Sequence, residues 1–313
     1  MLGEYPTKGP MLAPNDQVDF TVPKYPALVS YKFDGSRVIV YNGKLFTRNL
    51  KLHPNQNLKL RFAALLDLSC KGWVFDGELY DPNLEFNELQ STLRSFTAPL
   101  QSSLGLFLFD SVRLLEWNSE SRERFIDRIE TYRAQCAYNK PPYVTAVHQQ
   151  VVNDPASAQL YFNEVISNGG EGIILRDPQS RYKHGRATIK ERTMFKFKIS
   201  HTLDARIVEI TQGRKLRVGV ERTRRLDGSL ERPFKNEDYT LDNCMGAFVV
   251  EHEGKTFKVG TGKGLDRQMK EFIWQLKNQY IGRWIEFKYL PVGNKDVPRM
   301  GKFVRFRTDL DNG

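Results

Sequence analysis

Two basic side chains flank an Asp-Gly pair near the start of the chain. Lys32 and Arg37 lie on either side of Asp34 and Gly35, and β-rich residues precede and follow them. Asp-Gly between two such runs predicts a two-residue β-hairpin, in which Lys32 would face Arg37. Like charges at facing positions destabilise a bare sheet. The pair is therefore either two long side chains that splay into solvent or a clamp for an anion such as a phosphate.

Paired cations recur in two further strand-like segments. Alternation over residues 194–199 puts Lys196 and Lys198 on one face of a strand and apolar residues on the other. Such a strand could be an edge protected by charge, or it could be a second wall of a phosphate site. Arg305 and Arg307 alternate with apolar residues in the same way. Because solubility does not require three such strands, we favour the phosphate site.

Two glutamates stand beside a glycine in otherwise apolar strands. Glu78 follows Gly77, and Glu171 precedes Gly172. A carboxylate in such a strand is costly unless it is paired, hydrogen-bonded or bound to a metal. Mg²⁺ takes oxygen ligands from one or two carboxylates and from substrate phosphates. Glu78 and Glu171 are therefore candidate Mg²⁺ ligands, with an ion pair to one of the lysines as the alternative.

The elements that position these residues alternate between short β-rich runs and amphipathic helical runs. This pattern predicts a domain that contains both helices and strands. The expected strands are residues 27–33, 36–41, 73–80, 104–109, 172–176 and 194–199. The expected helices are residues 57–68, 86–95, 121–137 and 156–167. Asp81 or Asn83 would cap the second helix, and Asp154 with Pro155 would open the fourth.

A second domain is expected after a short joint at residues 199–204. From residue 205 the chain reads as short strands around one helix at 265–280, which suits a five-stranded β-barrel of the OB type. We place the domains at 1–202 and 203–313. Cations crowd the segment 213–235, and a run of this kind suits contact with a phosphate backbone. The candidate nucleic-acid-binding residues are Arg214, Lys215, Arg217, Arg222, Arg224 and Arg225.

The overall composition agrees with a nucleic-acid partner. The 313 residues include 47 Lys and Arg against 37 Asp and Glu, a formal net charge of +10. A surplus of this size indicates either an anionic partner or simply a basic protein. The three cysteines are scattered without a CxxC pair, so neither a zinc knuckle nor a disulfide framework is expected. With no apolar run long enough for a membrane span, we expect a soluble cytoplasmic protein, in the host cytoplasm if it is viral.

Taken together, these motifs resemble those of the covalent nucleotidyltransferase superfamily, and within it the ATP-dependent DNA ligases. KxDGxR is matched by Lys32, Asp34, Gly35 and Arg37, and Arg48 falls where the family has its next arginine. DGEL, apolar-Phe-Asp, EGxxL[KR] and KxK are matched by residues 76–79, 108–110, 171–176 and 196–198. The motifs follow the family's order and extend over nearly the whole chain. The chain is similar to the short bacteriophage and viral ligases.

The resemblance implies an α+β fold, with a nucleotidyltransferase (adenylation) domain of antiparallel sheets and flanking helices followed by a β-barrel OB-fold domain. It also implies a role for each motif residue. Lys32 would be the catalytic nucleophile that becomes adenylated. ATP as the substrate, Mg²⁺ and nicked duplex DNA are implied, and we expect a monomer. Phe109 would stack on adenine, although it could instead be a core residue. The implied ATP-binding residues are Arg37, Arg48, Glu78, Phe109, Lys196, Lys198 and Arg307, and the implied metal ligands are Glu171 and Glu78.

The last motif departs from the family pattern, and rival functions remain open. Gly301 stands where many of these ligases have Pro, and Leu310 stands where they have Lys. The alternatives are an RNA ligase, a GTP-dependent mRNA capping guanylyltransferase and a catalytically inactive nucleic-acid binding module. Capping enzymes typically begin the fourth motif with Asp, where this chain has Glu171. RNA ligases often have Asn at the end of the first motif, where this chain has Arg37.

Overall fold

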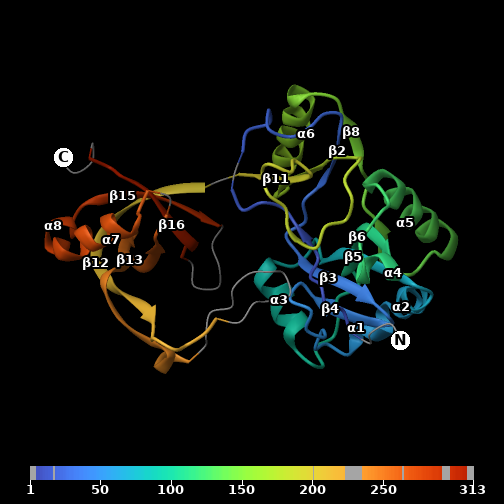
Figure 1. Cartoon of the computed structure of the whole chain (residues 1–313), viewed down its shortest axis with the longest axis horizontal. Coiled ribbons are helices and arrows are strands. Elements are labelled where there is room, and N and C mark those ends of the chain that lie inside the picture. Colours follow the sequence, from blue (N-terminus) through green and yellow to red (C-terminus); the bar gives the residue numbers. More distant parts are fainter. Residues whose placement is uncertain are drawn as a thin grey trace. The chain divides into compact units, whose positions relative to one another are not determined.

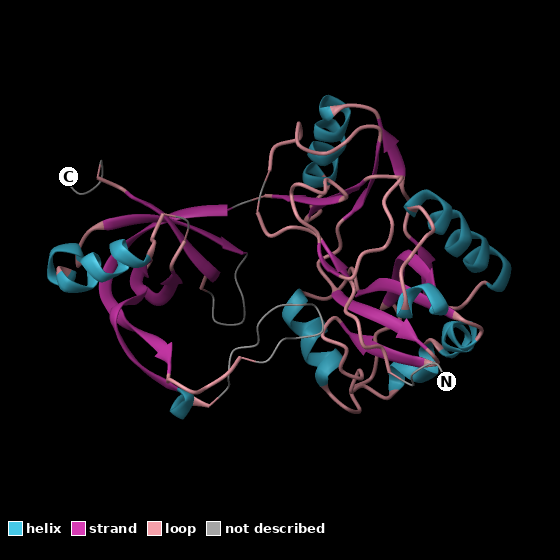
Figure 2. Cartoon of the chain, viewed as in Figure 1, coloured by secondary structure: helices cyan, strands magenta, loops and turns pink. Residues whose placement is uncertain are grey.

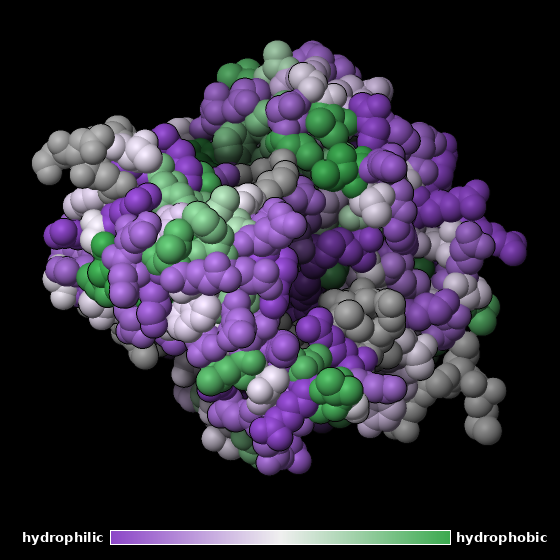
Figure 3. Space-filling model, turned by 60° about the vertical axis from the view of Figure 1, so that its left-hand side comes forward, coloured by the Kyte–Doolittle hydropathy of each residue, from purple (hydrophilic) through white to green (hydrophobic). Residues whose placement is uncertain are grey.

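The chain forms two compact units, each with a hydrophobic core of its own (Figure 1). The computed structural model describes residues 5–16, 18–199, 201–222, 235–262, 264–290 and 297–308. Among these residues, the first unit ends at Ile199 and the second begins at His201. The described residues include no helix long and apolar enough to cross a membrane. On the face in Figure 3, hydrophilic residues predominate and apolar residues form small separate groups.

The first unit contains two main β-sheets. The five-stranded sheet has the order β4 (Lys44–Thr47), β3 (Ser36–Tyr41), β5 (Trp73–Tyr80), β6 (Gly105–Arg113) and β7 (Val144–Ala146). The four-stranded sheet has the order β11 (Met194–Lys198), β9 (Gly172–Arg176), β2 (Ala27–Tyr31) and β8 (Gln150–Val152). A parallel pair joins β1 (Met11–Leu12) to β10 (Gly185–Arg186). Apart from the parallel β6–β7 pair, the strands of the two main sheets are antiparallel, as expected from the sequence.

Helices flank both sheets (Figure 2). Helices α2 and α5 pack against the five-stranded sheet, and helix α6 packs against the four-stranded sheet. The helices of this unit are α1 (Asn57–Arg61), α2 (Ala63–Cys70), α3 (Phe86–Arg94), α4 (Leu114–Asn118), α5 (Phe125–Asn139) and α6 (Pro155–Ser167). Leu65 of α2 and Ile129 of α5 belong to the same buried cluster as Val38, Val40 and Phe75 of the sheet. The amphipathic patterns in the sequence therefore correspond to helices that bury one face against strands.

The predicted hairpin at Asp34-Gly35 is wrong. The flanking strands β2 and β3 belong to different sheets, so Lys32 and Arg37 are not a facing pair within one sheet. The Lys32 backbone N–H instead donates to the Gly172 carbonyl at 2.9 Å, which continues the ladder between β2 and β9. A Cβ on Gly35 would overlap the Leu79 carbonyl oxygen, so this turn carries the chain tightly against β5.

One of the two predicted helix caps is wrong and the other is confirmed. The N-cap of α3 is Glu85, which forms a capping box with Glu88. Asp81 is occupied elsewhere, because it accepts hydrogen bonds from Asn83 N–H at 2.9 Å and from the Ser103 hydroxyl at 2.7 Å. At α6 the predicted Asp154 cap is present and accepts from the backbone N–H three residues on, at 2.7 Å.

The second unit is a closed five-stranded barrel, in agreement with the predicted OB-type domain. Its strand order is β12 (His201–Leu216), β13 (Tyr239–His252), β14 (Lys255–Gly260), β16 (Arg299–Phe306) and β15 (Trp284–Leu290). The short 3-10 helix η1 (Asn236–Asp238) precedes β13. The helices α7 (Arg267–Gln275) and α8 (Lys277–Tyr280) lie between β14 and β15 in the sequence. Phe248, Phe287 and Phe303 fill the core. Most of the predicted joint at 199–204 belongs to β12, because His201 already pairs with Tyr289 of β15.

Candidate active site

A pocket of about 380 Å³ in the first unit gathers most of the predicted site residues. This volume lies within the usual range for small-molecule sites. The four-stranded sheet contributes Lys196 and Lys198, and the five-stranded sheet contributes Arg37, Glu78 and Phe109. The remaining lining residues include Lys32 after β2, Arg48 after β4, Arg186 of β10 and Leu12, Ala13 and Asn15 of the N-terminal segment. Residues from widely separated parts of the chain therefore surround one cavity.

The Lys32 amine forms an ion pair with Glu171 at the pocket. The second carboxylate oxygen of Glu171 lies 3.7 Å from Lys198 Nζ. All three side chains remain partly accessible, with 22–27% of each exposed. Glycine is required beside Glu171, because a Cβ on Gly172 would overlap the Phe197 carbonyl oxygen. One carboxylate is thus shared by two amines, which matches the ion-pair alternative for Glu171.

The cations around Lys196 create a positively charged region. Burial and the charges of Arg186, Lys198, Lys32 and Arg48 together lower the pKa of Lys196 to about 8. Because these groups repel one another, an anion placed among them would be strongly stabilised. The region therefore suits the phosphates of a nucleotide.

Arg37 is held in place by a partner that the sequence did not reveal. Its guanidinium donates to Asp76 Oδ1 at 2.5 Å and to Oδ2 at 2.7 Å, and to the Met11 carbonyl at 3.1 Å. Burial alone would lower the pKa of Arg37, but Asp76 outweighs this effect and the pKa is raised. Tyr182 also donates to Asp76, at 2.5 Å. The only sequence signal for this role was the acidic residue in front of Gly77 in an apolar strand.

Phe109 is a pocket residue rather than a core residue. It is half-buried on β6 and lines the cavity, and the Arg37 guanidinium lies 4.5 Å from its ring centroid. A planar ring in this position can stack against a nucleobase. The placement is what the stacking role requires.

Glu78 faces the same cavity from β5, where it pairs with Arg37 of β3. Burial raises the pKa of Glu78 to about 7, although Arg37 and Lys32 act in the opposite direction. Asp76 and Glu171 raise the pKa of Glu78 as well, so the two predicted metal ligands interact electrostatically.

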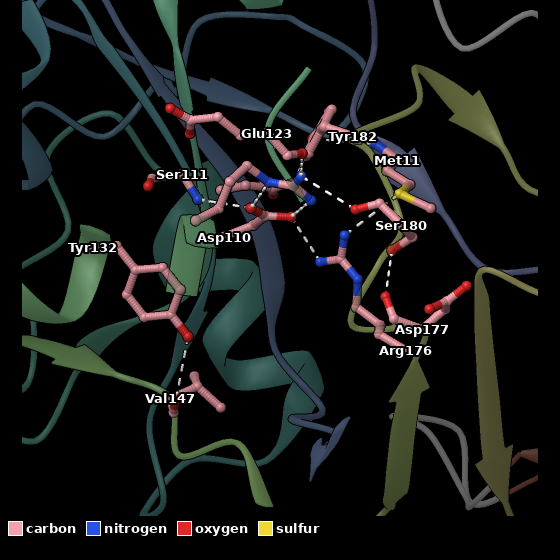
Figure 4. Close-up of polar contacts among 12 residues, drawn as sticks. Met11, Asp110, Ser111, Glu123, Tyr132, Val147, Arg176, Asp177, Ser180 and Tyr182 are labelled. Carbon is pink, nitrogen blue, oxygen red and sulfur yellow. Dashed lines mark hydrogen bonds and ion pairs between the residues drawn. The ribbon is translucent and has the colours of Figure 1, made fainter. Parts of the chain in front are cut away.

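Asp110, Arg128 and Arg176 form a buried ion triad (Figure 4), and Arg176 also lines the pocket. Asp110 accepts from Arg128 at 2.7 and 3.1 Å and from Arg176 at 2.7 Å. Burial would raise the pKa of Asp110, but the two arginines lower it overall. The triad ties β6, α5 and β9 together. Sequence motifs identified Asp110 and Arg176 without indicating that they meet.

Family comparisons agree with this geometry. A family model described as "ATP dependent DNA ligase domain" matches residues 10–198, more than half of the chain, and one described as "DNA ligase OB-like domain" matches residues 240–307. The chain belongs to the ATP-dependent DNA ligase family.

Several ligases resemble this ligase over most of its length. A DNA ligase of Haemophilus influenzae is 23% identical over 89% of this chain and 85% of its own. The structure of the Chlorella virus DNA ligase-adenylate is 25% identical, with a TM-score of 0.54, and the match covers 96% of this chain and 98% of that one. A Lig E DNA ligase has the same fold, with a TM-score of 0.67 at 21% identity, over 96% of this chain and 99% of that one. The chain spans only 35–45% of the longer ligases of Pyrobaculum arsenaticum, Methanococcus aeolicus and Mycobacterium.

The carboxylates at the ligase pocket suit a magnesium ion that is bound partly by the protein and partly by oxygen atoms of the substrate. Within the described ranges, no group of three or more Asp, Glu, His or Cys side chains could hold a metal alone. Mg²⁺ commonly uses one or two carboxylates and completes its shell with phosphates and water. Glu171 and Glu78 could supply those carboxylates, so the residues present suit an ion that arrives with a nucleotide.

The second unit of the ligase carries the remaining predicted residues. Arg214 and Lys215 lie on β12, where Arg214 contacts Asn236 at 3.1 Å and Lys215 lies 3.9 Å from Asp242. Arg217 and Arg222 follow the strand and are exposed. Arg224, Arg225 and Leu310 lie outside the described residues. Arg307 forms an ion pair with Asp204 of the same unit at 2.5 Å.

Proposed function

We propose that this ligase seals nicks in duplex DNA through a covalent lysyl-AMP intermediate on Lys32. The observation that carries the proposal is the meeting of Lys32, Glu171 and Lys198 beside a pocket rich in cations. An amine can attack phosphorus only when the negative phosphate oxygens around the target are neutralised. The arrangement supplies both the amine and the neutralising charges.

In the first step the neutral Lys32 amine attacks the α-phosphorus of ATP. A P–N bond forms, the bond to the β-phosphate breaks, and pyrophosphate leaves. Lys196 and Lys198 would contact the α-phosphate, Glu78 and Arg48 would hold the ribose, and Phe109 would stack on adenine. Asp76 keeps Arg37 at the pocket wall, where it can contact the sugar or phosphate. The ion pair between Lys32 and Glu171 has to open before the attack.

In the second step the AMP passes from Lys32 to the 5′-phosphate at the nick. In the third step the 3′-hydroxyl attacks that phosphate, the phosphodiester forms and AMP leaves. Glu171 and Glu78 are the proposed Mg²⁺ ligands, and the bound ion would neutralise phosphate charge. Arg307 would contact the triphosphate.

The second unit is proposed to bind the duplex as part of a monomeric enzyme. Arg214, Lys215, Arg217, Arg222, Arg224 and Arg225 would contact the phosphate backbone, which needs no base sequence. The cysteines among the described residues carry free thiols, which supports a reducing compartment such as the cytoplasm.

Labelling with α-labelled nucleotides tests the first step. The protein is incubated with Mg²⁺ and either ATP or GTP and separated on a denaturing gel. We expect acid-labile label from ATP that is lost in Lys32→Ala and discharged by nicked DNA. Lys24→Ala is the matched control, because Lys24 pairs with Asp177 and does not line the pocket. Label from GTP alone would indicate a capping enzyme, and no label would leave the binding-module alternative.

A further inference from the structure

Strand β6 carries a β-bulge at Phe109, one of the residues that line the pocket. The register pairs Asp110 of β6 with Asp76 of β5. The next pair joins Leu108 to Gly77, so the register skips the residue between them on β6. A bulge of this kind adds one residue to one strand of a pair, bends that strand and re-aims the side chains beside it. The skipped residue is therefore the one whose side chain faces the cavity.

The bulge also decides which face of the sheet Asp110 occupies. Side chains alternate along a regular strand, so Asp110 would follow Leu106 and Leu108 into the apolar cluster on their face. A carboxylate among leucines would be costly. The extra residue shifts the alternation by one position, and Asp110 instead shares a face with Asp76, its partner on β5. One bulge thus accounts for the placement of both Phe109 and the carboxylate that follows it.

Arg128 of α5 anchors the carboxylate that follows the bulge. Its Nε donates to Asp110 Oδ1 at 2.7 Å, and its Nη2 donates to Oδ2 at 3.1 Å. Arg176 donates to the same Oδ2 at 2.7 Å (Figure 4). The side chains of Arg128 and Asp110 are fully buried. Because a two-point contact between Arg and a carboxylate fixes geometry as well as charge, it holds Asp110 and, through the chain, the adjacent Phe109.

Arg128 can influence the pocket only from a distance. Arg176 is one of the lining residues, whereas Arg128 is not. Within the described part of the chain, the other hydrogen bonds of Arg128 go to the carbonyls of Glu123 at 2.6 Å and Ser180 at 3.4 Å. Any effect of Arg128 on a bound nucleotide therefore has to pass through Asp110.

We propose that Arg128 is a positioning residue that holds the Phe109 ring in the orientation for stacking on the nucleotide base. The bulge turns the ring into the pocket, and the anchored carboxylate keeps it there. A ring that is already fixed loses little conformational freedom when the base binds, so more of the stacking energy appears as affinity. The inference rests on the proposed function, because that function gives Phe109 its role in ATP binding. Arg128 takes no part in the bond-making step.

A double-mutant cycle between Arg128 and Phe109 tests the proposal. Self-labelling with α-labelled ATP is measured for the wild type, Arg128→Lys, Phe109→Ala and the double variant. Loss of a stacking ring weakens binding about 5- to 150-fold, so Phe109→Ala should raise the half-saturating ATP concentration within that range. Arg128→Lys keeps the charge but loses the two-point contact, and should raise this concentration about fivefold with little change in the maximal rate. The same substitution should change nothing in the Phe109→Ala background.

Two further proteins complete the design. Arg124→Lys is the matched control, because Arg124 is the exposed residue at the start of α5 and should label like the wild type. Asp110→Glu keeps the charge but lengthens the anchor by one methylene group, and it should show the same loss, again only when Phe109 is present. Urea unfolding identifies a temperature at which the proteins are folded, and Asp110→Glu carries the test if Arg128→Lys does not fold.

The outcomes separate this inference from the proposed function. An equal loss from Arg128→Lys with and without the Phe109 ring would mean that Arg128 only supports the fold, and it would overturn the positioning role. Wild-type saturation by ATP in Arg128→Lys and Asp110→Glu would overturn it as well. Unchanged saturation in Phe109→Ala would reject the stacking role and this inference together. Wild-type protein that accepts no label would contradict the Lys32 mechanism itself.

Discussion

Both carboxylate oxygens of Asp76 hold the Arg37 guanidinium, at 2.5 and 2.7 Å, across neighbouring strands of the five-stranded sheet. Asp76 is 1% exposed, so the carboxylate depends on Arg37 and Tyr182 for its stabilisation. Arg37 also lies over the ring of Phe109 in the pocket. The same ion pair therefore stabilises the fold and positions a pocket residue.

Asp76→Asn should destabilise the first unit and slow adenylation together. Removing one partner of a buried ion pair costs about 3–5 kcal/mol, because the other charge stays buried. Urea unfolding and single-turnover labelling measure the two effects. Asp127→Asn is the control, because Asp127 and its partner Arg124 are both exposed and such surface pairs contribute little to stability. Equal unfolding energies for the two variants would contradict the role of Asp76.

Glu78 should make folding stability depend on pH. Its pKa is raised by burial from 4.5 to about 7, so the folded protein binds more protons than the unfolded chain between these values. The free energy of unfolding contributed by Glu78 therefore falls as pH rises from about 4.5 to 7. Urea unfolding in the presence of EDTA should show a steeper decline for wild type than for Glu78→Gln. Identical slopes in this range would show that the carboxyl is not perturbed in this way.

Gly35→Ala should disturb the turn that carries Lys32. The added Cβ would overlap the Leu79 carbonyl and lie 2.7 Å from Glu78 Cγ. Overpacking of this kind costs about 1–3 kcal/mol, and we expect adenylation to fall with it. Gly260→Ala is the control, because its Cβ would meet only ordinary contact at 3.5 Å. If labelling by Gly35→Ala matched that of the control, the turn would not position the amine.

Charge reversal at Arg214 and Arg217 should weaken binding to nicked DNA while self-adenylation survives. Each lost phosphate contact reduces the slope of log K against log salt by about one unit. Titrations at several salt concentrations measure the slope. Reversal of the exposed Lys71 and Lys140 of the first unit serves as the control for net charge. An unchanged slope in the Arg214 and Arg217 variant would exclude β12 and its following turn from the DNA-binding surface.

Local sequence patterns predicted much of the site, and non-local pairings account for what they missed. Alternation within one strand correctly placed Lys196 and Lys198 on the pocket side of β11. The Asp-Gly hairpin failed because β2 takes β9 as its partner, about 140 residues further along the chain. The contacts of Arg37 with Asp76 and of Asp110 with Arg128 and Arg176 depend on sheet register and packing, which no local pattern contains.

Peptide mass spectrometry after incubation with ATP and Mg²⁺ tests the central claim most directly. The account predicts one AMP adduct, bound through phosphorus to the Lys32 amine. It also predicts that nicked DNA removes this adduct. An adduct on another residue, or a protein that seals nicks without ever carrying AMP on Lys32, would contradict the account.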